Sequence, residues 1–118
     1  MRLVHHPSSG EPVVLADRVE QATSWSTRAR GLMFRRSFPE GSALVFRFDT
    51  VRSRAIHMLF VSFAIDAVWL DGEVVTGKKT LRPWIGLARG RGDTIIECPE
   101  GTFASVSVGD RLVIEGTD

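Results

Sequence analysis

The sequence contains very little cysteine. Cys98 is the single cysteine among 118 residues, so an internal disulfide is excluded and no thiolate cluster can hold a metal ion. Chains that fold without disulfides are typical of a reducing compartment. Because a chain of this length can bury a hydrophobic core without cross-links, we expect one domain that comprises residues 1–118.

Long hydrophobic runs are also missing. The most apolar stretch, residues 55–76, is interrupted by Ser62 and Asp66, whereas about 20 apolar residues are needed to span a bilayer. The first ten residues contain no hydrophobic segment of the kind found in secretory signal peptides. These features predict a cytoplasmic protein that has no membrane partner.

Neither sign of charge is in large excess, because the formal net charge is +1. The distribution is uneven: residues 24–54 contain seven arginines and two acidic residues, whereas residues 93–118 contain six acidic residues and one arginine. The basic segment can attract an anionic ligand, or it can pair with the acidic segment. We expect no nucleic-acid partner, since a total charge near zero is atypical of proteins that bind nucleic acids.

Residues 55–76 contain the strongest secondary-structure signal. Asp71-Gly72 separates two runs that are rich in β-branched and apolar residues, and this dipeptide accepts the positive φ angles of a two-residue type I′ turn. The turn predicts a β-hairpin in which Asp66 lies opposite Gly77. Apolar residues occur on both faces of this hairpin, as expected for strands that are covered by two layers.

Short apolar segments bounded by turn residues occupy most of the remaining chain. Strands are predicted at residues 3–6, 13–20, 43–48, 55–59, 94–98, 103–108 and 111–115. A short helix is predicted at 27–33, and connections are predicted at 49–54 and 77–92. The sequence therefore predicts a mainly β protein, an antiparallel β-sandwich or partly open barrel with one or two short helices. Residues 1–12 are expected to form an N-terminal edge segment.

An ordered set of short motifs extends through most of the chain. It begins with Ala22-Thr23 and with residues 28–33, Arg-Ala-Arg-Gly-Leu-Met, and continues in segments at 43–46, 57–58, 65–71, 81–84, 96–101 and 108–110. In this order and spacing, residues 13–115 resemble a widely distributed family of small proteins known as domain of unknown function 192. The resemblance implies a jelly-roll-like β-sandwich with short helices packed against it, and a helical segment at 102–107 in place of a strand. It implies no activity.

His57 and Asp66 are the first candidates for a chemical role. A carboxylate that holds an imidazole in one tautomer is part of many catalytic sites, but the sequence lacks a Gly-x-Ser-x-Gly nucleophile motif. Cys98 is expected to be buried and inert. Alternatively, His57 packs in the core, and Asp66 accepts hydrogen bonds from loop amides or pairs with an arginine, since Gly77 offers it no cross-strand partner. No complete catalytic set is present, so an enzymatic activity stays uncertain.

Metal ligands are sparse in the sequence. His5 and His6 are adjacent, so on a strand their side chains point to opposite faces and cannot chelate one ion. His57 could meet Glu97 or Asp49, but no His-x-His pair accompanies them. We therefore expect neither a metal ion nor another cofactor.

A ligand site is predicted around Arg82-Pro83-Trp84. The proline stiffens a loop that presents an arginine and a tryptophan, side chains that together can stack on a sugar or a base and bind an anion. Alternatively, Trp84 covers the core and Arg82 pairs with an acidic residue. The candidate ligand-binding residues are Arg28, Arg35, His57, Asp66, Arg82, Trp84 and Glu97.

The function expected from these residues is binding of a small polar or anionic ligand, such as a carbohydrate. Two alternatives stay open. One is a hydrolase or lyase that uses His57 and Asp66. The other is an interaction module whose basic face docks an acidic partner.

Overall fold

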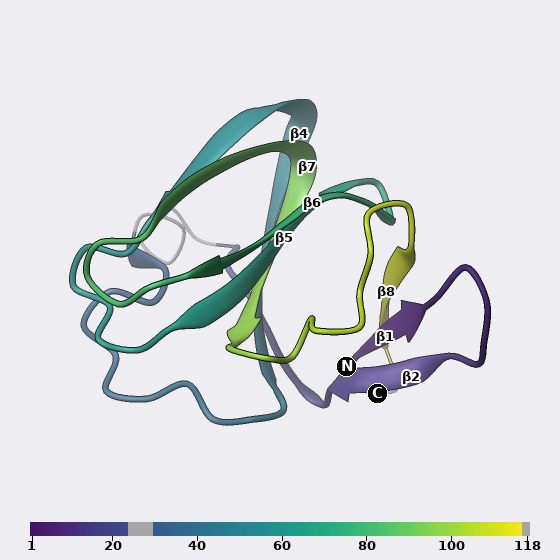
Figure 1. Ribbon diagram of the computed structural model, residues 1–118, viewed down its shortest axis with the longest axis horizontal. Helices are drawn as coiled ribbons and strands as arrows, with labels where there is room; N and C mark the ends of the chain where they lie inside the picture. The colour runs from purple at the N-terminus through teal and green to yellow at the C-terminus, as the bar shows by residue number, and fades with distance from the viewer. Residues whose placement is uncertain (24–29, 117–118) are drawn as a thin grey trace.

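The computed structural model describes residues 1–23 and 30–116, which form one eight-stranded mixed sheet (Figure 1). The strands are β1 (Arg2–His6), β2 (Val13–Ala16), β3 (Arg18–Gln21), β4 (Ser42–His57), β5 (Ile65–Asp71), β6 (Val74–Leu81), β7 (Leu87–Pro99) and β8 (Arg111–Glu115). They are arranged in the order β2-β1-β8-β6-β5-β7-β4-β3, and β3 pairs with β4 in parallel. The prediction of a mainly β fold is confirmed, although one open sheet is observed in place of two separate ones.

The predicted helices are not found among the described residues. Residues 27–29 of the predicted helix 27–33 lie outside them, and residues 31–34 form turns. The segment 102–107, for which both a strand and a helix were expected, consists of turns followed by irregular chain. Gly31 at a φ of 53° and Gly101 at a φ of 95° adopt left-handed conformations, which interrupt a right-handed helix. The described residues contain no helix of the length and hydrophobicity that a bilayer crossing requires.

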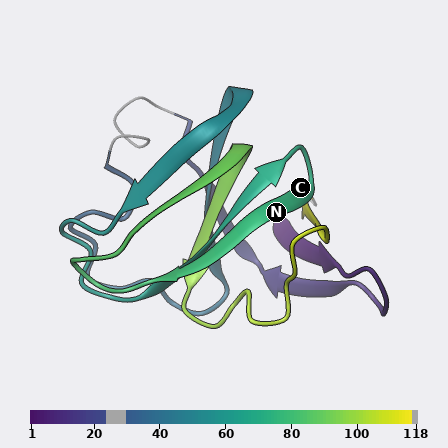
Figure 2. The same ribbon diagram turned by 45° about the horizontal axis from the view of Figure 1, so that its top comes forward.

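Two strands are much longer than the sequence pattern indicates. β4 includes the whole of the segment 49–54, and β7 includes residues 87–92 of the segment 77–92, both of which were expected to be connections; residues 77–81 belong to β6. β4 and β7 bend together at the top of Figure 1. The pairing of β4 with β7 is irregular between Arg47 and Arg52, where the bend occurs. Glycine on β7 allows the backbone of β5 to approach closely, because a Cβ atom at Gly92 would lie 2.3 Å from the carbonyl oxygen of Leu70. Figure 2 shows how strongly the sheet is twisted as a result.

Side chains on the central strands alternate between two hydrophobic clusters. The first cluster contains Val45, Val68, Leu70, Ile96, Cys98 and Phe103, and the second contains Leu44, Phe46, Ala67, Trp69 and Ile95. Because successive strand residues point to opposite faces, β4, β5 and β7 contribute to both clusters. All residues of β5 except Asp71 are buried, as expected for a strand with two covered faces, whereas most of β6 is exposed.

The β5–β6 hairpin turns at Gly72 and Glu73, where Gly72 has a φ of 63°, and Asp71 pairs with Val74. The predicted register is wrong for two reasons: the turn lies one residue later than predicted, so that Leu70 faces Val75, and a β-bulge then places Trp69 opposite Gly77. Thr76 occupies the bulge, and its hydroxyl hydrogen-bonds to the carbonyl oxygens of Trp69 and of Arg91 on β7. The shift places Thr80, and not Gly77, opposite Asp66.

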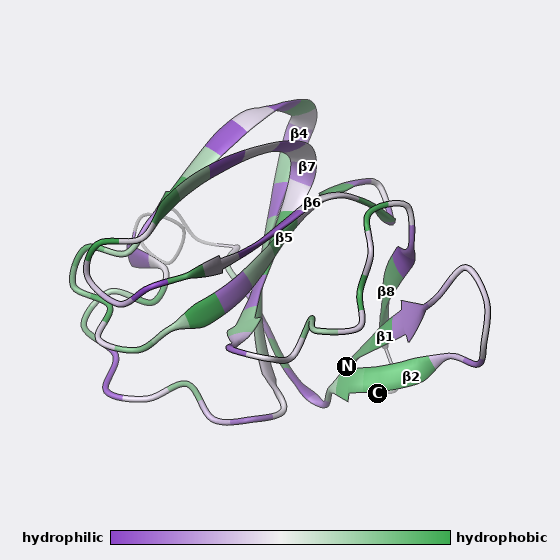
Figure 3. Cartoon of the chain, in the orientation of Figure 1, coloured by the Kyte–Doolittle hydropathy of each residue, from purple (hydrophilic) through white to green (hydrophobic). Residues whose placement is uncertain are grey.

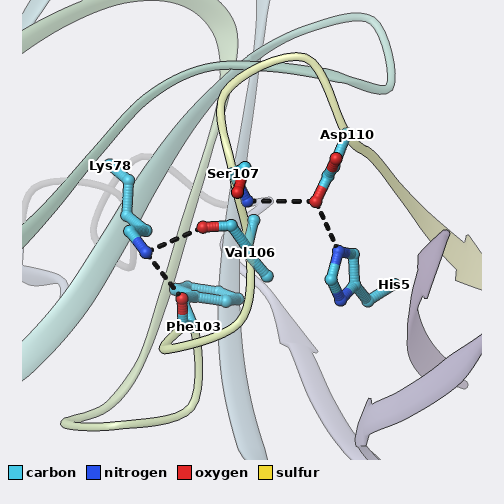
Figure 4. A network of polar contacts seen from close by, with 6 residues as sticks. All are labelled: His5, Lys78, Phe103, Val106, Ser107 and Asp110. Carbon is cyan, nitrogen blue, oxygen red and sulfur yellow. Dashed lines mark hydrogen bonds and ion pairs between the residues drawn. The ribbon is translucent and has the colours of Figure 1, made fainter. Parts of the chain in front are cut away.

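The segment between β7 and β8 is held by polar contacts that are partly or fully buried (Figure 4). Lys78 Nζ donates hydrogen bonds to the carbonyl oxygens of Phe103 and Val106 at 3.0 and 2.7 Å. Asp110 Oδ2 lies 2.7 Å from His5 Nε2 and accepts a 3.0 Å hydrogen bond from the Ser107 backbone. These two hydrogen bonds lower the pKa of Asp110 and connect the segment to the first strand.

Candidate ligand-binding cavity

A cavity of about 150 Å³ lies beside the second cluster, between the turn at residues 30–33 and strands β4 and β7. Three polar side chains line it, those of Arg30, His57 and Glu97. The rest of its described lining is apolar and includes Leu32, Met33, Phe46, Phe48, Ile56, Met58, Val61, Ile65 and Ile95. A mainly apolar cavity with a few convergent polar groups is typical of small-molecule sites.

Strand alternation explains which residues reach the cavity. Phe46 and Phe48 share one face of β4, and Ile95 and Glu97 share one face of β7. The bend in β4 and β7 then brings the far end of β4, with His57, over the same face. The cavity therefore depends on the bend as well as on the side-chain pattern.

Glu97 is the unusual residue of this cavity. Only 6% of its surface is exposed, and no hydrogen bond to its carboxyl is made within residues 1–23 and 30–116. No fully buried side-chain oxygen of these residues lacks a partner, so the carboxyl oxygens of Glu97 keep some contact with the open cavity. Burial away from water raises the pKa of Glu97 to about 7, against a smaller lowering by the Arg35 guanidinium. Relative to the ordinary value of 4.5, this shift corresponds to about 3 kcal/mol against the ionised form.

His57 and Arg30 lie at the exposed side of the cavity. His57 Nδ1 accepts a 3.2 Å hydrogen bond from the Leu59 backbone N–H, so the neutral ring carries its proton on Nε2. Arg30 Nε donates a 3.0 Å hydrogen bond to the Met33 carbonyl, which fixes the direction of its guanidinium. Both side chains thus offer hydrogen-bond donors, whereas Glu97 offers an acceptor in its ionised form.

Asp66 lies on the other side of the sheet and has a structural role. Its carboxylate accepts hydrogen bonds from the Thr80 hydroxyl at 2.8 Å and from the backbone N–H groups of Gly101 and Phe103, each at 3.0 Å. The expected loop amides are present, but the expectation that no cross-strand partner exists is wrong, because the observed turn and the bulge together bring Thr80 opposite Asp66. Asp66 and His57 do not form a pair, since His57 lines the cavity and Asp66 faces the first cluster.

The remaining candidate residues are dispersed. Arg35 forms an ion pair with Glu20 at 2.9 Å and acts on the cavity only through its charge. Arg82 and Trp84 are exposed and do not line the cavity, and Arg28 lies outside the described residues. Of the six candidates that lie in the described chain, His57 and Glu97 are therefore the two that the structure brings to one cavity.

The cavity has no nucleophile or metal-binding cluster in its described lining. The described part of the chain contains no group of three His, Cys, Asp or Glu side chains that could hold a metal ion. Cys98 is fully buried, and burial together with the charges of Asp66 and Glu97 raises the pKa of its thiol far above the ordinary range. A thiol in such surroundings does not form the reactive thiolate.

Sequence reasoning missed Arg30 and most of the apolar lining. The alternation of Phe46 with Phe48 indicated a shared face, and Glu97 was considered as a residue that His57 could meet. The turn at 30–33 could not be placed against that face from the sequence, because its position depends on the bend in β4.

The motifs that suggested a family are matched across nearly the whole chain. The DUF192 profile, described as an uncharacterised ACR, matches residues 5–114. The chain belongs to the DUF192 family. A UPF0127 protein from Pyrococcus abyssi is 37% identical over 101 residues, which are 80% of this chain and 84% of that protein. A UPF0127 protein from Thermococcus kodakarensis is 29% identical over 102 residues, which are 85% of this chain and 65% of that protein.

Two solved structures share the fold of this DUF192 protein. A Sinorhizobium meliloti protein, provisionally described as a transcription regulator, superimposes with a TM-score of 0.81 at 23% identity over 95% of this chain and 91% of its own. A Novosphingobium aromaticivorans protein of unknown function gives a TM-score of 0.81 at 19% identity over 96% of this chain and 84% of its own. At these identities the likeness shows the fold alone, so a functional argument depends on the cavity.

Proposed function

We propose that this DUF192 protein binds a small molecule in the cavity, with a hydrogen-bond donor of the ligand directed at Glu97. The observation that carries the proposal is a largely buried carboxyl that borders the cavity and makes no hydrogen bond within the described chain. Burial of an unpaired carboxyl is costly, so a partner that completes its hydrogen bonds gains affinity from the same interaction.

The size of the cavity limits the ligand. An engineered protein cavity of about 150 Å³ holds benzene, and the present cavity of about 150 Å³ suits a ligand part with a similar number of heavy atoms. The apolar lining favours a compact carbon skeleton, and the carboxyl favours a hydroxyl or a protonated amine at the inner end. A wholly anionic ligand, one of the classes expected from the sequence, is disfavoured beside Glu97.

The outer end of the ligand would meet a different environment. Arg30 and His57 both line the cavity and are exposed, and both offer hydrogen-bond donors. An acceptor or a negative group at the outer end complements them. Small amino acids, amino alcohols and hydroxy acids combine the two ends in one compact molecule, and they are the ligand class that we favour over a sugar.

A thermal-shift screen tests the proposal. Amines, alcohols, hydroxy acids, amino acids and monosaccharides are tested against the wild type and against Glu97→Gln, which keeps the side-chain shape but removes the charge. A ligand at 100 times its Kd should stabilise the wild type by about 2.7 kcal/mol, and Glu97→Gln should bind it at least about tenfold more weakly.

Glu100→Gln is the matched control, because Glu100 is exposed and lies on the turn that follows β7. It should bind every compound as the wild type does. A screen without any binder would refute the proposal, and so would a ligand whose affinity is the same for the wild type and for Glu97→Gln.

A further inference from the structure

One end of the molecule exposes an unusual amount of apolar surface. We use the name apolar tip for Phe34, Leu59, Phe60, Trp84, Ile85 and Leu87, which are between 49% and 74% exposed. They lie on the turn before β4, on the β4–β5 connection, and on the β6–β7 connection with the start of β7. Figure 3 shows hydrophobic colour on these connections at the left end of the molecule. Such a concentration of exposed apolar side chains marks an interaction surface.

The apolar tip is an organised structure. The rings of Phe34 and Phe60 stack with centroids 4.8 Å apart, and the Phe34 backbone N–H donates a 2.8 Å hydrogen bond to the Phe60 carbonyl. Phe34, Phe60 and Trp84 have φ angles of 67°, 60° and 66°, and no other non-glycine residue in the described chain has a positive φ. A left-handed conformation is unfavourable for bulky side chains and is concentrated at functional sites.

The backbone of the apolar tip is largely satisfied from within. Six backbone N–H groups in its three segments donate hydrogen bonds to carbonyl oxygens of the same segments. The donors are Phe34, Met58, Val61, Trp84, Ile85 and Gly86. A partner that added a β-strand would need free backbone groups, whereas a hydrocarbon medium requires that these groups be already paired. This pairing favours a lipid surface over a peptide.

The charges around the apolar tip have one sign. The segments 30–36, 57–64 and 81–91 contain six arginines and no aspartate or glutamate. Arg35 is paired with Glu20, but two copies joined through this surface would bring the other arginines together with no carboxylate from these segments between them, which disfavours a dimer. Arg36 and Arg82 are exposed within these segments, where a guanidinium can contact an anionic lipid headgroup.

We propose that the apolar tip docks onto an anionic phospholipid membrane, with its aromatic side chains at the level of the headgroups. Tryptophan and phenylalanine prefer this interface, and flanking arginines add attraction to negatively charged lipids. This proposal departs from the expectation of no membrane partner, which was based on spanning and signal segments; that the described residues contain no membrane-spanning helix does not bear on peripheral binding. The proposal is independent of the cavity and of any ligand in it.

Vesicle sedimentation tests the proposal with the full chain. Wild-type protein is mixed with vesicles of phosphatidylcholine alone or with added phosphatidylglycerol, at low and at physiological ionic strength. Binding should require phosphatidylglycerol and weaken as salt is added, because the arginines are screened. Brominated lipids should quench the fluorescence of the wild type more than that of Trp84→Phe.

Two variants separate the apolar and the charged contributions. Phe60→Asn with Trp84→Asn should weaken vesicle binding at least about tenfold, since asparagine tolerates a left-handed φ and removes the apolar surface. Arg36→Gln with Arg82→Gln leaves that surface intact and should weaken binding by a similar factor. The control Val108→Asn changes a residue that is 65% exposed on the turn before β8 and should bind as the wild type does.

Two results would overturn the proposal. One is wild-type protein that stays in the supernatant with phosphatidylglycerol vesicles, which would leave an acidic protein as the occupant to consider. The other is folded Phe60→Asn/Trp84→Asn protein that binds vesicles as strongly as the wild type. If that variant does not fold, full vesicle binding by the double arginine variant would overturn the proposal instead.

Discussion

Replacement of Glu97 by glutamine should stabilise the protein above pH 7 and have a much smaller effect at pH 5. Because the folded-state pKa of about 7 lies above the ordinary value of 4.5, the folded state binds the proton of Glu97 more tightly than the unfolded state does. The stability of the wild type must therefore fall as the pH rises from about 4.5 to about 7, and then level off. Glutamine does not titrate, so the stability of the variant lacks this fall with pH.

The magnitude follows from the two pKa values. The full effect is about 3 kcal/mol, and about 2.5 kcal/mol of it develops between pH 5 and pH 8. Other ionisable groups contribute equally to the wild type and to Glu97→Gln, so the difference between the two proteins isolates Glu97. The advantage of the variant in free energy of unfolding should grow by about 2.5 kcal/mol over this interval.

Urea unfolding at half-unit steps of pH provides the assay. Linear extrapolation gives the free energy of unfolding of each protein, and equal m-values verify that both unfold in the same way. Glu100→Gln, at an exposed position, serves as the control and should parallel the wild type. A constant difference between Glu97→Gln and the wild type from pH 5 to pH 8 would refute the account of a buried carboxyl.

Three further changes test other parts of the structure. Asp66→Ala removes the acceptor of three hydrogen bonds and should lower the free energy of unfolding by about 3 kcal/mol, measured in urea. Gly92→Ala should lower it by at least about 2 kcal/mol, since the Cβ would lie 2.3 Å from a carbonyl oxygen, whereas Gly116→Ala has nothing nearby and should stay within about 0.5 kcal/mol. The hydrogen bond to His5 lowers the pKa of Asp110 from 3.8. The ionised carboxylate therefore stabilises the folded protein above pH 3.8, and this stabilisation is lost as the pH falls further. Asp110→Asn should reduce the acid-induced drop in melting temperature below about pH 4, and an unchanged drop would contradict this.

Local signals in the sequence were sufficient for part of the fold. Gly72 correctly marked the position of the hairpin turn, and the apolar residues on both faces of the hairpin indicated that β5 is buried on two sides. Both signals come from residues that are neighbours in the sequence. The register was wrong because the turn is formed by Gly72 and Glu73 in place of Asp71 and Gly72, and because Thr76 enters a bulge that is stabilised by hydrogen bonds to other strands.

The bend of β4 and β7 could not be derived from the sequence. Residues 49–54 are polar and residues 77–92 are basic and rich in glycine, a composition typical of connections. The glycines instead allow strands to pass close to Trp69 and Leu70, which is a contact between distant parts of the chain. The same bend assembles the cavity, so Glu97 was recognised as a candidate while the residues around it, such as Arg30, were not.

Titration of the Glu97 carboxyl carbon by NMR tests the central claim most directly. The resonance is identified by its loss in Glu97→Gln, and its chemical shift is followed from pH 3 to pH 9. We predict a midpoint near pH 7, to which burial raises the pKa of this carboxyl. A midpoint near the ordinary value of 4.5 would show a solvated or hydrogen-bonded carboxylate and would contradict the account.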